Sequence, residues 1–214
     1  MSPFIDEGRN LLITEFGRDY GTYFSILLAI AQGRTSQAEI TAALGGIAIG
    51  GHLERLENTY QLISKFRPVM SKPGSKNTVR FRISDNFLQF WFRFIERSRS
   101  MIELDNYNDL CKVVIRDYPT FSGLMLEKYF RQKLTEEGGF REMGSWWERK
   151  AGKDANEIDI VGIRAEGKSA LVAEVKRNAC NYDNKVFMAK IEHIKTKILS
   201  GYDIESRLYT IDDM

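Results

Sequence analysis

Two apolar segments near the C-terminal end carry side chains that are suited to metal-assisted chemistry. Asp159 lies in residues 157–161, and Glu174 and Lys176 lie in residues 171–176, after a short polar turn. If both segments are strands, the alternation of side chains directs Glu174 and Lys176 to the same face. Paired as a hairpin, the strands would bring Asp159 beside Glu174. Two close carboxylates suit a hard cation such as Mg²⁺, and the ammonium group could stabilise negative charge or orient an attacking water.

A third carboxylate precedes these strands on an expected helix. Residues 102–117 predict a linking helix, and Pro119 then starts a second helix that Gly138 and Gly139 end. Glu127 lies on this second helix. A lone glutamate on a helix is usually solvated, but its position ahead of the strand pair makes Glu127 a candidate third carboxylate.

The composition is that of a globular protein. The chain has 214 residues, of which 43% are hydrophobic and 28% charged. It has neither an apolar run of membrane-spanning length nor a signal-peptide pattern, so we expect no membrane association and a cytoplasmic location. Cys111 and Cys180 form no CxxC pair, which argues against a disulfide framework or a zinc site.

Basic residues gather in one part of the chain, although the net charge is only +2. Residues 63–100 contain nine Lys and Arg but only two acidic residues. Such a stretch could contact phosphate. The candidate nucleic-acid-binding residues here and on the helix before it are Arg55, Lys65, Arg67, Lys72, Lys76, Arg80 and Arg82.

The same region has the pattern of a winged helix-turn-helix. Ser36 and Glu39 have the spacing of a helix capping box, and a turn-rich loop at residues 71–77 separates two extended runs. Helices are expected at residues 23–32, 36–44 and 49–60, and strands at 62–69 and 78–83. The third helix starts with apolar and glycine residues, which offer nothing to base edges. Phosphate contact by the strand hairpin and docking of another protein are both open.

An aromatic run at residues 87–94 follows, and Asp85 is placed to cap its helix. Aromatics interleaved with arginines can stack on single-stranded bases. A helix that is apolar almost all round is more typical of a core, and we predict that this one is buried and joins the two halves of the chain.

These motifs together resemble a known superfamily. The order of Glu127 on a helix, then Asp159, then Glu174-Val-Lys176 resembles the PD-(D/E)XK restriction-endonuclease-like proteins related to Holliday-junction resolvases. More narrowly, residues 8–214 resemble the C-terminal region of a family of prokaryotic AAA-type ATPases. The segments that carry this resemblance are residues 83–94, 144–147, 157–161 and 174–177.

The resemblance implies an α/β (α+β) fold in two domains. Residues 1–98 would form the winged helix with its aromatic bridging helix, and residues 99–214 a nuclease-like domain with a central mixed sheet flanked by helices. Asp159 and Glu174 would hold Mg²⁺ or Mn²⁺, Glu127 would support the metal, and Lys176 would assist the attacking water. In that family an ATPase domain precedes the winged helix, so the chain is expected to be either a fragment or a stand-alone descendant.

A phosphate-binding-loop pattern also occurs, because Gly162 to Ser169 fits GxxxxGK[ST]. That chemistry needs a helix after the loop, whereas residues 170–176 look like a strand. We therefore interpret the loop as a hairpin turn and expect no ATP binding.

Several other polar residues are given structural roles. Glu174 and Lys176 could simply be a solvated face on an edge strand. Trp146 and Trp147 are placed just before the second strand, with one packed on the core. His193 is given neither a metal nor a base role, and a final helix at 184–199 presents a solvated lysine face. Those lysines are Lys185, Lys190, Lys195 and Lys197.

Two functional hypotheses remain open. The first is a Mg²⁺-dependent DNA endonuclease with Glu127, Asp159, Glu174 and Lys176 as catalytic residues. The second is a catalytically silent module that binds nucleic acid or protein and derives from an AAA-type ATPase. The expected partners are DNA, an ATPase and a second copy of the chain. The second copy is expected because cutting both DNA strands favours a two-fold dimer.

Overall fold

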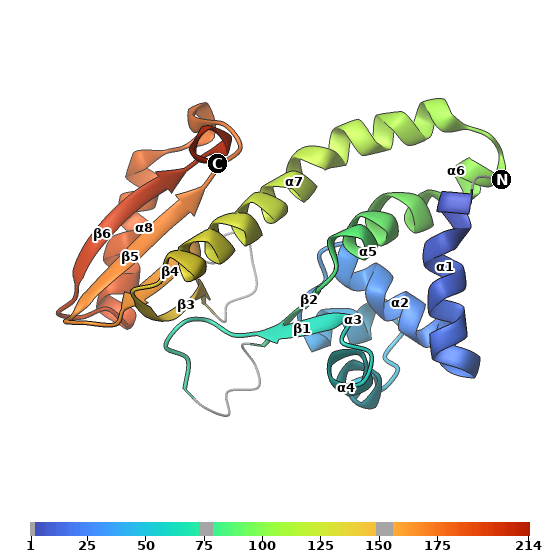
Figure 1. The fold of residues 1–214 in the computed structure, drawn as a ribbon, viewed down its shortest axis with the longest axis horizontal. Coiled ribbons are helices and arrows are strands. Elements are labelled where there is room, and N and C mark those ends of the chain that lie inside the picture. Colours follow the sequence, from blue (N-terminus) through green and yellow to red (C-terminus); the bar gives the residue numbers. More distant parts are fainter. Residues whose placement is uncertain (1–2, 73–78, 149–155) are drawn as a thin grey trace. The chain divides into compact units, whose positions relative to one another are not determined.

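The computed structural model describes residues 3–72, 79–148 and 156–214, which divide into two compact units (Figure 1). Unit 1 is Met1–Phe66 with Val79–Asp117, and unit 2 is Arg67–Thr78 with Tyr118–Met214. The boundary predicted after residue 98 lies inside unit 1. Two ion pairs connect the residues around that position to the rest of unit 1: Arg97 pairs with Asp117 at 2.9 Å, and Arg99 pairs with Asp6 at 3.6 Å.

Unit 1 is a helical unit with a two-stranded hairpin. Its capping box forms as predicted, because the backbone N–H of Glu39 donates to Ser36 Oγ and the Ser36 N–H donates to Glu39 Oε2. Strands β1 and β2 are antiparallel, with Ile63 opposite Ile83. The elements are α1 (Pro3–Phe16), α2 (Tyr20–Ala31), α3 (Gln37–Ala43), α4 (Gly50–Asn58), β1 (Ile63–Phe66), β2 (Arg80–Ile83), α5 (Asn86–Phe90) and α6 (Arg99–Glu103).

Most of the aromatic run is buried in unit 1, as predicted, but Phe87 is exposed and the run lies within unit 1 instead of joining the two halves of the chain. Asp85 caps α5 by accepting a hydrogen bond from the Leu88 N–H, and a π-helical turn continues the helix over Trp91–Ile95. The side chains of Trp91, Phe92 and Phe94 are 0% exposed. These three rings therefore cannot stack on nucleic-acid bases in the folded protein.

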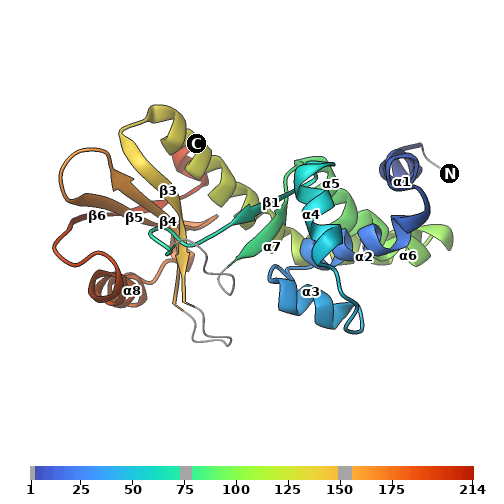
Figure 2. The ribbon, with the colours of Figure 1, turned by 90° about the horizontal axis from the view of Figure 1, so that it is seen from below.

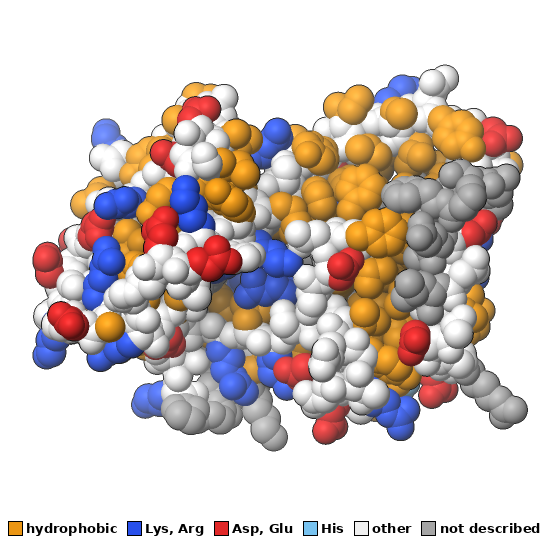
Figure 3. All heavy atoms as spheres, in the orientation of Figure 1, with side chains coloured by type: hydrophobic (Ala, Val, Ile, Leu, Met, Phe, Trp, Pro, Cys, Tyr) orange, Lys and Arg blue, Asp and Glu red, His pale blue; other side chains and the backbone are white. Residues whose placement is uncertain are grey.

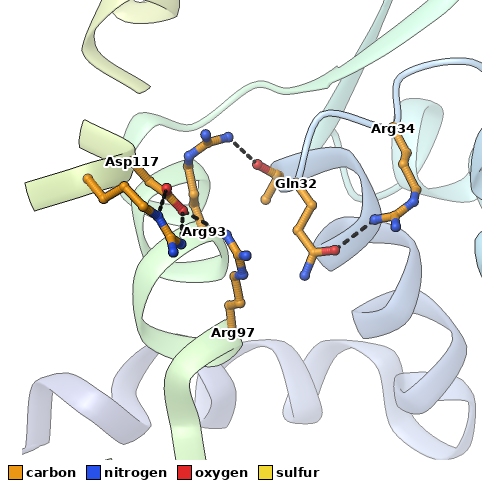
Figure 4. A network of polar contacts seen from close by, with 7 residues as sticks. Gln32, Arg34, Arg93, Arg97 and Asp117 are labelled. Carbon is orange, nitrogen blue, oxygen red and sulfur yellow. Dashed lines mark hydrogen bonds and ion pairs between the residues drawn. The ribbon is translucent and has the colours of Figure 1, made fainter. Parts of the chain in front are cut away.

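An arginine network surrounds Asp117 at the end of unit 1 (Figure 4). Arg97 and Arg116 both donate to its carboxylate, at 2.9 and 2.7 Å. Arg93 is buried, and its Nη1 donates to the carbonyl of Ala31 at 3.0 Å. Burial lowers the pKa of Arg93, since a guanidinium loses hydration there.

Helix α7 (Tyr107–Glu137) is one continuous helix of 31 residues with Pro119 inside it. The prediction of two helices separated before Pro119 was therefore wrong. Proline removes one backbone hydrogen bond from a helix, but does not by itself end it. Beyond the proline, apolar residues recur at the spacing of a helix face, and Phe121, Leu126 and Phe130 are buried.

Unit 2 contains the predicted mixed sheet. Strands β3 (Phe140–Trp147), β4 (Glu157–Arg164), β5 (Ser169–Val175) and β6 (Asp203–Tyr209) lie in the order β3-β4-β5-β6. The first three are antiparallel neighbours, and β6 is parallel to β5. The sequence had not assigned β6. The turn between β4 and β5 confirms the hairpin, so the GxxxxGKS segment is followed by a strand and not by a helix.

Helices cover both faces of this sheet (Figure 2). The second half of α7 packs on one face, where Leu126, Phe130 and Leu134 meet Ile160 and Ala173. Helix α8 (Asn184–Lys197) packs on the other face, in a cluster that includes Trp146, Ile158, Val172, Phe187 and Ile191. The predicted α/β (α+β) class, with a mixed sheet flanked by helices, is confirmed.

The segment that follows β1 belongs to unit 2. The Val69 N–H donates to the carbonyl of Ser145 at 3.0 Å, and the Met70 N–H donates to Glu142 Oε1 at 2.9 Å. The strand predicted over residues 62–69 therefore ends at Phe66. Residues 73–78, which include the predicted start of the next strand, lie outside the described residues. None of the helices in the described ranges combines the length and apolar character needed to cross a membrane.

Candidate functional site

Asp159 lies at a β-bulge near the start of β4. Gly144 on β3 pairs with Val161, but Trp146 pairs with Ile158, so β4 contains one extra residue over this stretch. Bulges change the direction in which a side chain points. The Asp159 carboxylate reaches the end of β5, where its Oδ2 accepts a hydrogen bond from the Val175 N–H at 2.8 Å.

Glu174 is buried, with 6% of its surface exposed. Its Oε1 lies 2.7 Å from Lys176 Nζ and 3.1 Å from Lys190 Nζ. The contact with Lys176 agrees with the shared face expected from strand alternation. Since β5 lies between β4 and β6, the alternative of a solvated edge strand was wrong.

Lys190 belongs to the site, although the sequence predicted that this lysine lies on a solvated helix face. Its side chain is 23% exposed and pairs with Glu174. Lys190 follows the buried Phe187 by three residues and precedes the buried Ile191, so it lies at the inner edge of α8. The prediction of a solvated face was wrong for this lysine, while Lys185, Lys195 and Lys197 are exposed.

Arg131 connects Glu127 on α7 to the bulge, and the sequence analysis missed it. Its Nη1 donates to the Asp159 carbonyl at 2.9 Å and to Ser145 Oγ at 3.0 Å, and lies 3.4 Å from Glu127 Oε2. Ser145 Oγ also donates to the Asp159 carbonyl at 2.9 Å. The available signal was its spacing, because a residue four positions after Glu127 lies on the same helix face.

Two of these carboxyl groups are difficult to ionise. Burial, and then the charge of Asp159, raise the pKa of Glu127 to about 7, although Arg131 opposes the shift. Burial, and then the charge of Glu174, raise the pKa of Asp159 to about 6, against the Val175 N–H and two lysines. At neutral pH Asp159 is therefore mostly ionised, whereas Glu127 is protonated in a large fraction of the molecules.

Lys176 keeps its charge in this environment. Burial alone would lower the pKa of its ammonium group, but the hydrogen bond to Glu174 and the charges of Asp159 and Glu127 outweigh that effect. The net result is a raised pKa. Lys176 is therefore suited to stabilising an anion and unsuited to acting as a neutral base.

Some of these carboxylates are suited to binding a metal ion. Within residues 3–72, 79–148 and 156–214, no three His, Cys, Asp or Glu side chains converge as a ready metal site. Glu127 approaches from the α7 side, whereas Glu174 meets Lys190 on the α8 side. Mg²⁺, however, is usually held by one or two carboxylates together with water and substrate phosphate. Asp159 and Glu127 fit that role, since a cation would relieve their repulsion.

A groove opens beside these residues in unit 2. Its volume is about 670 Å³, within the range of about 300–1,000 Å³ typical of ligand sites. Glu127 and Lys176 both line it. Its other lining residues come from α7 and from the turn after β5: Pro119, Thr120, Gly123, Leu124, Val175, Arg177, Asn178 and Asn181.

The candidate nucleic-acid-binding residues of unit 1 do not form one face. Lys65 pairs with Phe81 in the β1–β2 ladder, whereas Arg82 and Arg80 pair with Ser64 and Phe66, the neighbours of Lys65. Paired residues point to the same face and neighbouring residues to opposite faces. Arg80 and Arg82 therefore lie on one face of the hairpin, and Lys65 lies on the other. Lys65 is also paired with Glu57 at 2.7 Å.

The remaining candidates are scattered. Arg55 lies on α4 and contacts the Tyr23 hydroxyl at 3.4 Å. Arg67 and Lys72 are exposed and belong to unit 2, and Lys76 lies outside the described residues. On the face of unit 2 seen in Figure 3, basic and acidic side chains are interspersed.

Three aromatic and histidine predictions have clear outcomes. Trp146 and Trp147 precede the second strand, β4, as predicted, where they form the end of β3, and both are buried, at 6% and 5% exposure. Both therefore pack in the core. His193 Nε2 lies 2.7 Å from Glu148 Oε1, so the histidine has a carboxylate partner that the sequence did not indicate.

Comparison with known proteins places the site within a matched region. The family described as "Archaea bacterial proteins of unknown function" (DUF234) matches residues 91–187, which include all four predicted catalytic residues. The chain is also similar to an uncharacterised protein of Methanocaldococcus jannaschii, at 31% identity over 164 residues. That alignment covers 72% of this chain and 35% of the relative, so the chain spans about a third of that protein's length. No solved structure shows significant similarity.

Proposed function

We propose that unit 2 is a Mg²⁺- or Mn²⁺-dependent DNA endonuclease of the PD-(D/E)XK type. One observation carries the proposal: the Asp159 carboxylate accepts a hydrogen bond from the Val175 N–H, between Glu174 and Lys176, and lies close enough to Glu127 on α7 for its charge to raise the Glu127 pKa. Their carboxyl groups repel one another, which is the electrostatic condition that a divalent cation relieves.

Each residue has a distinct part in the proposal. Asp159 and Glu127 would hold the cation, and Glu174 would join them once an ammonium group releases it. A bound divalent cation supplies charge stabilisation and makes bound water more acidic. Lys176 would stabilise charge on the attacked phosphate or orient the water, since its ammonium stays protonated. Arg131 and Ser145 would position Asp159 through its carbonyl.

The alternative is a silent nucleic-acid- or protein-binding module. One specific observation favours it: Lys176 and Lys190 already pair with Glu174, and together they supply the charge that a divalent cation would supply. A site of this kind could be structurally complete without metal.

Cleavage of DNA separates the two proposals. Supercoiled plasmid and a labelled four-way junction are incubated with Mg²⁺, Mn²⁺ or EDTA, and nicked products are measured. We expect metal-dependent nicking that Asp159→Asn and Lys176→Ala abolish and that Lys195→Ala, an exposed lysine of α8, leaves intact. If the protein binds DNA but neither metal gives cleavage, the silent module is correct.

The wider assignments rest on the same proposal. A winged-helix role for unit 1 is supported by part of its element order, in which α2, α3 and α4 are followed by the antiparallel β1–β2 hairpin. DNA as substrate, a homodimer, an ATPase partner and a cytoplasmic location remain predictions. Size determination with and without DNA would test the homodimer.

A further inference from the structure

We propose that Arg177 binds a backbone phosphate of the nucleic-acid strand, next to the phosphate that Lys176 contacts. The inference rests on the proposed function and names how that site holds its substrate. It places the strand in the groove between α7 and the turn after β5.

The groove offers many more hydrogen-bond donors than negative charges. One wall comes from α7 and the other from residues 175–178 and 181. Among the described residues that line the groove, Glu127 is the one carboxyl group. The donors are the cations of Lys176 and Arg177, the amides of Asn178 and Asn181, and the hydroxyl of Thr120. Such a lining fits an anionic ligand with several oxygen acceptors.

Arg177 differs from the other cations near the site. Lys176 and Lys190 pair with Glu174, and Arg131 is engaged by Glu127, Ser145 and the Asp159 carbonyl. In the described chain Arg177 has no carboxylate partner. Its guanidinium lies over the Tyr118 ring at 5.6 Å, and its Nε, although shielded from solvent, has no hydrogen-bond partner.

An arginine without a carboxylate partner and with an unsatisfied Nε–H lowers the stability of the fold unless a ligand accepts its hydrogen bonds. An unsatisfied buried donor costs free energy, and no carboxylate among the described residues of unit 2 pairs with Arg177. The planar guanidinium can match two phosphate oxygens at once, and the Tyr118 ring lies beside it. Lys176 and Arg177 are adjacent in the chain, so one strand in the groove can meet both cations with neighbouring phosphates.

Binding measured without metal tests this inference apart from cleavage. A fluorescently labelled single-stranded oligonucleotide is titrated in EDTA at several salt concentrations against the wild type, Arg177→Gln, Arg177→Lys and Lys195→Gln. We expect Arg177→Gln to weaken binding about tenfold and to reduce the salt slope by about one. Arg177→Lys should recover part of the affinity, and Lys195→Gln should match the wild type. Thermal unfolding of each variant checks the fold.

The outcomes separate this inference from the proposed function. Loss of affinity in Arg177→Gln supports the phosphate contact even if the wild type never cleaves DNA. If the wild type cleaves DNA while folded Arg177→Gln binds and cleaves equally well, the inference is overturned and the nuclease proposal stands. Failure of the wild type to bind the oligonucleotide also overturns the inference.

Discussion

Lys190 on α8 lies 3.1 Å from the Glu174 carboxylate on β5, which Lys176 also contacts at 2.7 Å. The carboxylate expected to bind metal is therefore paired with two ammonium groups. Burial strengthens these contacts and makes the loss of either one costly. The balance between lysine and metal at Glu174 decides whether this site can be catalytic.

Removing Lys190 should change stability and metal affinity in opposite directions. We expect Lys190→Met to lower the metal-free unfolding free energy by about 1–3 kcal/mol, because buried Glu174 keeps only one partner. The same change should increase Mg²⁺ affinity several-fold, since one competing cation is gone. Urea unfolding in EDTA and calorimetric Mg²⁺ titration measure the two effects. Lys195→Met is the control, and equal stability of all three proteins would contradict the pairing.

Glu127 should make the metal-free protein less stable as pH rises. Its pKa is about 7 in the folded protein, against an ordinary value of 4.5. A raised carboxyl pKa means that stability is retained below about pH 4.5 and is lost as pH rises through 7. Glu127→Gln should be more stable than the wild type at pH 8, by roughly 1–3 kcal/mol, and similar at pH 5.

Urea unfolding at both pH values in EDTA measures this difference, with Glu137→Gln at the exposed end of α7 as the matched control. Added Mg²⁺ should raise the unfolding free energy of the wild type at pH 8 and should not raise that of Glu127→Gln. A Glu127→Gln protein that shows no gain at pH 8 would contradict the raised pKa.

Arg131 should matter for both stability and cleavage. Arg131→Met leaves the Asp159 carbonyl with Ser145 alone and removes the cation beside Glu127, so we expect a loss of about 1–3 kcal/mol. Arg131→Lys should recover part of the loss, because the ammonium keeps the positive charge beside Glu127 but lacks the rigid guanidinium geometry. Thermal unfolding and plasmid nicking are the measurements. Arg141→Met, an exposed arginine on β3, should retain cleavage.

Gly162 should be required for packing and not for nucleotide binding. A Cβ there would lie 2.7 Å from the Phe140 ring and 2.8 Å from Met143, so Gly162→Ala should destabilise the fold by about 1–3 kcal/mol. Gly21→Ala, with open space around it, should be neutral or stabilising. Denaturant unfolding tests both. A thermal shift with ATP that Gly162→Ala abolishes would instead indicate a phosphate-binding loop.

Local patterns in the sequence determined several features correctly. Ser36 with Glu39 and Asp85 with Leu88 form their caps because the interacting residues are only three positions apart. The β4–β5 hairpin follows from a short polar turn, and strand alternation places Lys176 with Glu174.

Tertiary structure alone decided the surroundings of the candidate site. Lys190 reaches the Glu174 carboxylate across 16 residues of chain, and Arg131 reaches the Asp159 carbonyl across 28, which no local periodicity reveals. The bulge at Asp159 depends on the register with β3, and the continuity of α7 depends on packing on both sides of Pro119. The sequence by itself supplied the residue types and local geometry, since those arise from neighbouring residues. Folding decided their charge partners and pKa values, because burial and distant contacts control both.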